Sequence, residues 1–141
     1  MTLHFFLKSP SRLLSSLLWL IAAHSFFVGI MLIIQPASLI KFMGFVEIHE
    51  RFFPCQGGVF HIILALVYSF GAIKPVKNRL LIHFAIIVKL TAAFFLFYYY
   101  IIADNKWIIL LSGFGDLLMG LSICGALIYY SMNVNNNGQN K

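Results

Sequence analysis

The sequence predicts an all-α integral membrane protein, a four-helix transmembrane bundle. Only 10% of its 141 residues are charged and 61% are hydrophobic, with a mean hydropathy of +0.92. A typical soluble domain has about 25% charged residues. A helix rises about 1.5 Å per residue, so about 20 apolar residues cross a hydrocarbon core of about 30 Å. We expect one transmembrane domain over residues 1–141, with spans at about 13–34, 54–73, 80–103 and 107–130.

The first apolar run is read as a membrane span and not as a cleaved signal peptide. From Leu13 to Ile34 it is longer than a signal-peptide core of roughly 7–15 residues. It ends in Gln35-Pro36, where a cleavage site would have small residues. Residues 1–12 then form a short N-terminal segment.

The loop between the first two spans is long and unusually apolar. Residues 36–44 predict a short interfacial helix that Gly44 closes. After it, charged and apolar residues alternate up to Arg51. Two readings stay open, a loop folded on the lipid headgroups or a lid over the mouth of the bundle. The candidate mouth or lid residues are Glu47, His49, Arg51 and Gln56, with Glu50 beside them.

The later spans carry their own markers. Gly57 and Gly58, near the start of the second span, would let a neighbouring helix approach closely. Trp107 opens the fourth span at one interface. Residues 131–141 are polar and rich in asparagine, and we expect a disordered tail there.

The basic residues predict orientation rather than nucleic-acid binding. Six lysines and arginines flank the spans on the side of the two termini, three lie on the other side, and the tenth is Lys89. This asymmetry predicts cytoplasmic termini, in what we expect to be a bacterial inner (plasma) membrane. Despite the net charge of +6, no basic patch interleaved with stacking aromatics predicts nucleic-acid binding.

Asp116 is the only charge in the fourth apolar run. It lies about 14 Å in from one end of its span, and Lys89 lies about 14 Å in from the opposite end of the third span. A tight turn joins these spans, so they should be antiparallel neighbours. Because an unpaired charge in a bilayer costs several kcal/mol, we predict a Lys89–Asp116 ion pair near the midplane.

Two histidines are candidates to join this pair. Counting along the spans places His24 about 17 Å in and His61 about 10 Å in, on different helices. Together with Asp116 and Lys89 they are the candidates for ligand binding or a proton path. A purely structural cluster that sets helix order and register stays open, and so does haem ligation by the two histidines. We expect no metal site and no resident cofactor, since no spacing such as HExxH occurs.

Several motifs in this sequence resemble those of small four-helix membrane proteins of the DoxX-like family. The resemblance covers roughly residues 36–125 and implies a four-helix membrane fold, with some members tied to redox or terminal-oxidase modules. Cys55 and Cys124 fall near opposite ends of different spans, so no cysteine pair supports a thiol-redox role. The residues that carry the resemblance are Arg51, Gln56-Gly57-Gly58, Lys74-Pro75, Lys89 and Gly115-Asp116-Leu117-Leu118.

The expected function is non-enzymatic. We expect an accessory or assembly subunit, or a binder of a lipid- or quinone-like molecule, with the midplane cluster as its polar core. One alternative is a small transporter or proton-conducting component, and a second is a membrane-embedded enzyme acting on a lipid or sterol. Expected partners are the lipid bilayer and either further copies of the chain or a larger membrane complex.

Overall fold

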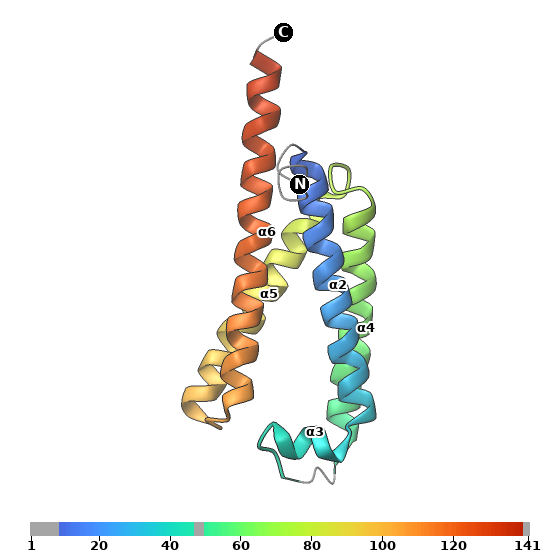
Figure 1. Ribbon diagram of the computed structural model, residues 1–141, viewed down its shortest axis with the longest axis vertical. Coiled ribbons are helices and arrows are strands. Elements are labelled where there is room, and N and C mark those ends of the chain that lie inside the picture. Colours follow the sequence, from blue (N-terminus) through green and yellow to red (C-terminus); the bar gives the residue numbers. More distant parts are fainter. Residues whose placement is uncertain (1–8, 47–49, 140–141) are drawn as a thin grey trace, which may run out of the picture.

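The computed structural model describes residues 9–46 and 50–139, with side chains up to Asn133. The described backbone is helical with no strand. Four helices are long and apolar enough to cross a membrane, which confirms the expected transmembrane four-helix bundle (Figure 1). The helices are α2 (Pro10–Ile34), α3 (Ala37–Phe42), α4 (Phe52–Ile73), α5 (Arg79–Ile102) and α6 (Trp107–Gln139).

Local chemistry sets the ends of α2 and α3. Helix α2 begins at Pro10. Proline suits the first helical turn because N–H groups there have no acceptor within the helix, so its lack of an N–H loses no hydrogen bond. It ends at Ile34, and the next residue, Gln35, caps it in a left-handed conformation with φ 50°. The predicted interfacial helix is present as α3. Gly44, with φ 88°, closes it as expected.

The C-terminal part of α6 corrects one expectation. Residues 131–139 continue the helix to Gln139, where the sequence predicted disorder from residue 131 onward. Extending an existing helix orders one residue for each hydrogen bond gained, so poor helix formers can prolong it. Asn133 Nδ2 also donates to the carbonyl of Tyr129 at 2.8 Å. Residues 140–141 of the expected tail lie outside the described part of the chain.

The four long helices form two pairs. Helix α2 packs extensively on α4, and α5 packs on α6, whereas contacts between the pairs are much fewer. The pairs lie together near the start of α2 and diverge toward α3 (Figure 1). We call the end with the start of α2 and the α4–α5 turn the basic end. The opposite end, with α3 and the α5–α6 turn, is the loop end.

A glycine contact joins α2 to α4. A Cβ atom on Gly58 would lie 2.7 Å from the carbonyl oxygen of Gly29, and one on Gly29 would lie 2.7 Å from the oxygen of Gly58. Neither position therefore has room for a larger side chain. Gly57 is different, because its Cβ would meet nothing nearer than 4.0 Å. Of the predicted glycine pair, only Gly58 makes the close helix approach.

The apolar core that joins all four helices is confined to the half of the bundle near the basic end. It uses the first half of α2 and α5 and the second half of α4 and α6, which antiparallel packing brings to one level. Toward the loop end, the buried residues lie within each pair. The buried core residues are Leu14, Leu18, Ile21, Ala22, Tyr68, Ala72, Ile82, Ala85, Ile123 and Ala126.

Helix α3 lies across the loop end, between the two pairs (Figure 1). The rings of Phe42 and Trp107 meet edge to face with centroids 5.6 Å apart, which links α3 to the start of α6. Lys106 Nζ lies 4.9 Å from the ring centroid of Phe45, just beyond α3. Side chains therefore connect α3 to the α5–α6 pair.

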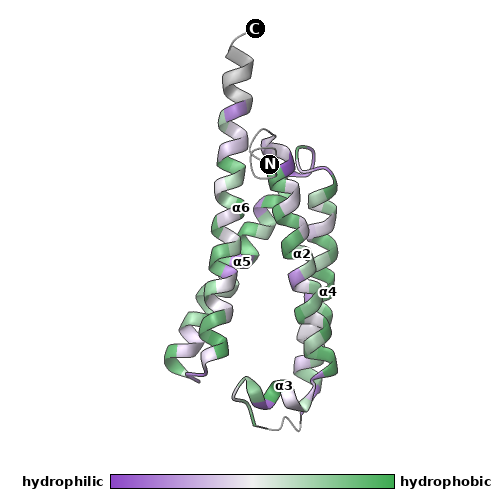
Figure 2. Ribbon diagram, in the orientation of Figure 1, coloured by the Kyte–Doolittle hydropathy of each residue, from purple (hydrophilic) through white to green (hydrophobic). Residues whose placement is uncertain are grey.

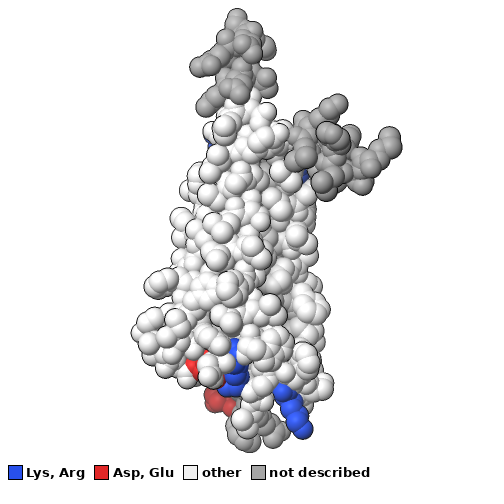
Figure 3. Space-filling model, turned by 60° about the vertical axis from the view of Figure 1, so that its left-hand side comes forward, with Lys and Arg blue, Asp and Glu red and all other residues white. Residues whose placement is uncertain are grey.

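The outer surface fits a lipid environment. Many large apolar side chains are exposed, including Leu20, Phe27 and Phe94, the last at 74%. Green, hydrophobic residues dominate the middle of the helices in Figure 2. On the face shown in Figure 3, charged side chains lie near the two ends and leave an uncharged belt between them. The chain is therefore described as an integral membrane protein with four spans.

Candidate functional site

The predicted ion pair is present. Lys89 Nζ lies 2.6 Å from Asp116 Oδ1, and the two residues are 2% and 8% exposed. Gly120, one turn after Asp116, makes the close approach of α5 possible. A Cβ there would lie 3.0 Å from Leu90 Cδ2 and 3.4 Å from Lys89 Cβ. The small residue on α6 thus allows Lys89 to reach Asp116 inside the protein.

The pair does not use all of its hydrogen-bonding groups. A lysine ammonium has three donors and an ionised carboxylate has two acceptor oxygens. Within the described residues, Lys89 Nζ donates to Asp116 Oδ1 and to no other acceptor. The pair therefore offers both donors and an acceptor to a further polar molecule.

His24 and His61 lie within electrostatic range of the ion pair. Each interacts with the charges of Lys89 and Asp116, and His61 also interacts with His24. His61 is half-buried, and its Nδ1 is buried without a hydrogen-bond partner in the described structure. His24 is exposed although it lies in the middle of α2. The structure therefore brings the four predicted residues to one region between the two helix pairs.

Tyr68 belongs to the same region, and the sequence analysis did not name it as a site residue. It is 1% exposed, its hydroxyl has no described hydrogen-bond partner, and it interacts electrostatically with Asp116. Tyr68 follows His61 by seven residues, about two helical turns, so both lie on one face of α4. That spacing was the available signal. We call His24, His61, Tyr68, Lys89 and Asp116 the polar layer.

The expected mouth residues that are described lie at the loop end, near the end of α2 and the start of α4. Arg51 Nη2 donates to the last two carbonyls of α2 at 3.3 and 3.0 Å, so it caps that helix. Glu50 Oε1 accepts the N–H at the start of α4 at 2.8 Å. Gln56 is exposed near the start of α4. Glu47 and His49 lie outside the described residues.

A hollow of about 510 Å³ lies at the loop end, beside α3. Lys41 and Arg51 supply its cations, and Ile40, Phe45 and Val46 supply apolar walls. Arg51 also donates to carbonyls at the end of α2. The hollow therefore lies at the junction of α2, α3 and α4. It is separate from the polar layer.

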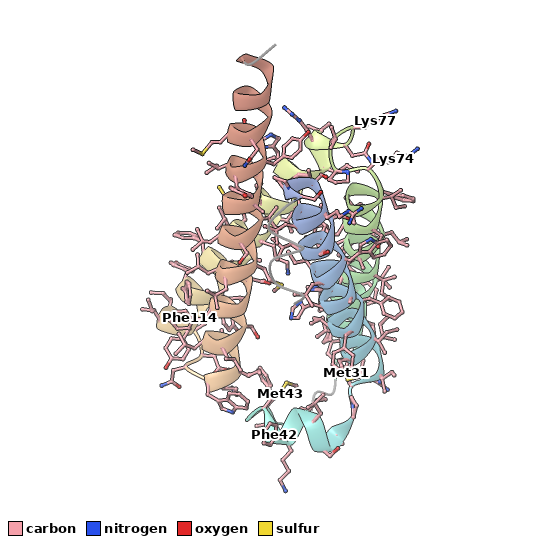
Figure 4. The ribbon with its side chains drawn as sticks, turned by 45° about the horizontal axis from the view of Figure 1, so that its top comes forward. Met31, Phe42, Met43, Lys74, Lys77 and Phe114 are labelled. Carbon is pink, nitrogen blue, oxygen red and sulfur yellow. The ribbon has the colours of Figure 1, made fainter. Side chains whose placement is uncertain are left out.

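The helix pairs diverge from the polar layer toward α3 (Figure 1). Met43, just after α3, lies on the α3 side between α6 and α2 in Figure 4. The absence of four-helix core residues in this half agrees with that divergence. The arrangement suits a molecule with one polar end and an apolar body.

Metal ligands and thiols do not gather in the described structure. No group of three histidine, cysteine or acidic side chains could hold a metal ion there. Cys55 and Cys124 are both free. His83 is exposed on α5, outside the polar layer.

Comparison of this chain with protein-family models, with curated proteins and with solved structures found no match.

Proposed function

We propose that this protein binds a lipid- or quinone-like molecule between its two helix pairs, with the polar head of that molecule in the polar layer. The buried Nδ1 atom of His61, which has no partner in the described structure, carries the proposal. Leaving a buried polar group unpaired costs about 1–3 kcal/mol. A bound head that pairs with Nδ1 removes that cost.

The charges of the polar layer favour an uncharged head. The positive charge of Lys89 and the negative charge of Asp116 cancel at 2.6 Å. A phosphate or carboxylate would upset this balance, whereas a carbonyl or hydroxyl group would not. Lys89 has N–H donors left after its bond to Asp116, and the Tyr68 hydroxyl is also unpaired among the described groups. Carbonyl oxygens of a quinone-like head match these donors.

The path toward α3 suits the apolar part of the ligand. The helix pairs diverge over this half, and α3 closes the end through the contact of Phe42 with Trp107. Ligands of this class bind where a mostly apolar space meets a few convergent polar groups. An accessory subunit of a larger membrane complex, with both termini in the cytoplasm of a bacterium, is the cellular setting that we propose for this binding.

Membership of the DoxX-like family is part of the same proposal. Among the residues that carry the resemblance, Gly58 makes the contact with α2, Lys89 and Asp116 make the ion pair, and Arg51 caps α2. Each has a physical role at a junction between helices. These roles support the family assignment without testing it.

The test is a titration of the detergent-purified protein with decylubiquinone, followed by quenching of tryptophan fluorescence. His61→Phe removes the unpaired nitrogen. We expect roughly tenfold weaker binding of the quinone, the change in affinity that the loss of one hydrogen bond causes. His61→Asn keeps a polar group near the position of Nδ1 and should restore most of the affinity. His83→Phe is the matched control, because His83 is exposed and lies outside the polar layer.

Equal affinity of the native protein and the His61→Phe variant would contradict the proposal. So would an equal loss in the His83→Phe control, since that result indicates a general effect of the substitution on the protein rather than the loss of a contact with His61. A Soret absorption band in the purified protein would instead assign the two histidines to haem.

A further inference from the structure

The basic end is rich in lysine and arginine. Arg12 stands at the start of α2, and Lys74, Lys77 and Arg79 stand in or next to the α4–α5 turn. None of the four acidic residues of the chain belongs to either segment. Lys74 and Lys77 are exposed and form no ion pair within the described structure. These two lysines are therefore available to an anion from outside the protein.

Three of these cations line an open hollow. Its volume is about 440 Å³, and it lies between the first turns of α2 and the α4–α5 turn. Arg12, Lys74 and Lys77 supply the cations, and Ser11 supplies a hydroxyl. Val76 and Pro75 form part of the apolar wall. A hollow with cations and apolar walls at the end of membrane spans fits a charged head that continues into an apolar chain.

Hydrogen bonds hold the two sides of the hollow together. Ser15 Oγ on α2 donates to the carbonyl of Ala72 on α4 at 2.7 Å. Asn78 Nδ2 donates to the carbonyl of Phe70 at 2.8 Å, and the N–H of Asn78 bonds to the carbonyl of Lys74 at 2.9 Å. The turn that carries the lysines is thus ordered, and its cations are presented in a fixed segment.

We propose that this basic hollow binds the phosphate of an acidic phospholipid headgroup. Basic pockets at the ends of transmembrane helices bind anionic headgroups in this way, and each lysine or arginine near a membrane surface adds to the attraction. Lys74 and Lys77 extend outward from the turn in Figure 4, at the end of the helices where lipid headgroups lie. The two glycerol-linked acyl chains would run down the exposed apolar side chains of α2 and α4. This site is independent of the polar layer, which favours an uncharged head.

Lipid titration followed by native mass spectrometry tests the site. The protein in neutral detergent is titrated with phosphatidylglycerol and, separately, with phosphatidylcholine. We expect the native protein to prefer phosphatidylglycerol. Replacing both lysines in Lys74→Gln/Lys77→Gln should raise the apparent Kd for phosphatidylglycerol about tenfold or more and leave that for phosphatidylcholine unchanged.

Two further variants separate the hollow from total charge and from misfolding. Lys74→Arg/Lys77→Arg keeps the charges and should bind phosphatidylglycerol like the native protein. Lys41→Gln/Lys106→Gln removes the same charge at the loop end and should leave the preference intact. A loss of equal size in this control would overturn the proposal, because it would show that net charge alone attracts the lipid.

Competition with inorganic phosphate distinguishes a lipid headgroup from a free anion. Millimolar phosphate should leave the phosphatidylglycerol complex in place, since the lipid adds the contacts of its acyl chains. Displacement of the lipid by phosphate at that concentration would refute a phospholipid site. No preference of the native protein for phosphatidylglycerol over phosphatidylcholine would refute it as well.

Discussion

Replacing the buried ion pair one residue at a time and then both together tests whether the pair stabilises the fold only as a pair. Lys89→Met removes the cation and leaves Asp116 charged in a site where its side chain is 11% exposed. Asp116→Leu leaves the ammonium group of Lys89 in a site where that side chain is 3% exposed. The double variant removes both charges and keeps the side-chain volumes similar.

The structure gives the expected magnitudes. Breaking a buried ion pair by removing one partner costs about 3–5 kcal/mol, because the other charge stays buried without compensation. Replacing both partners by apolar residues of similar size is typically neutral, or stabilising by about 1–4 kcal/mol. If the two sites were independent, the single costs would add to about 6–10 kcal/mol. The pair at 2.6 Å therefore predicts a large deviation from additivity.

The assay is reversible unfolding of the helical bundle in mixed micelles, as sodium dodecyl sulfate is added and helicity is followed by circular dichroism. The control is Lys41→Met, because Lys41 is exposed at the loop end and its loss should change the free energy of unfolding by less than about 0.5 kcal/mol. A double variant destabilised by about the sum of the single effects would refute the reasoning. So would single variants that each cost less than about 1 kcal/mol.

The same double variant separates the structural role of the pair from a binding role. A stable double variant that no longer binds decylubiquinone would assign the pair to the ligand site. A stable double variant that binds as the native protein does would make the pair a structural contact, and His61 and Tyr68 would be the remaining polar groups for the head.

Further substitutions test three individual contacts, each by the same unfolding assay or by a simple probe. Gly58→Ala should destabilise the protein by about 1–3 kcal/mol because a Cβ there meets a backbone oxygen at 2.7 Å. Gly57→Ala is the control and should change the free energy of unfolding little, because the nearest atom to its Cβ lies 4.0 Å away. Equal effects of the two substitutions would contradict the close helix contact. Arg51→Gln removes the donor that caps α2 and should cost about 1 kcal/mol, with amide exchange faster at the end of that helix. Phe42→Ala removes the edge-to-face contact and should raise the collisional quenching of Trp107 by acrylamide, and unchanged quenching would show that α3 does not cover that ring.

The two inferred sites differ in the charge that each can accept. In the polar layer, the charges of Lys89 and Asp116 cancel and the unpaired groups are hydrogen-bonding atoms. At the basic end, Lys74 and Lys77 have no acidic neighbour in sequence or in the described structure. The two proposals therefore predict different ligands, an uncharged molecule inside the bundle and charged lipids at its rim.

Sequence reasoning was most successful where the free-energy cost of placing a single residue decides the structure. A charge inside an apolar run must be compensated, so Asp116 and its partner Lys89 could be predicted from depth alone. Gly44 closes α3 because glycine tolerates the left-handed backbone that the turn needs. The four spans follow from the length and apolar character of the runs, which the bilayer requires.

The tertiary structure was needed for the features that depend on many weak contacts, such as the pairing of the helices. Helices in lipid associate through packing and small residues rather than through burial from water, so the pairing of α2 with α4 through Gly29 and Gly58 is not readable from hydropathy. The structure also shows that His61 Nδ1 is buried without a described partner and that His24 is exposed. Arg51 could be placed at the mouth by its position in the loop, but only the folded chain shows that it caps α2.

By itself, then, the sequence determined that the protein lies in a membrane, how many spans it has and how deep its charges lie. Each of these features depends on the chemistry of single residues in a bilayer of known thickness. Only the tertiary structure decided which helices are neighbours, that Tyr68 joins the polar layer and that α6 continues beyond its span. Those features depend on side-chain shape across helices distant in the chain, where no single residue carries enough free energy to predict the outcome.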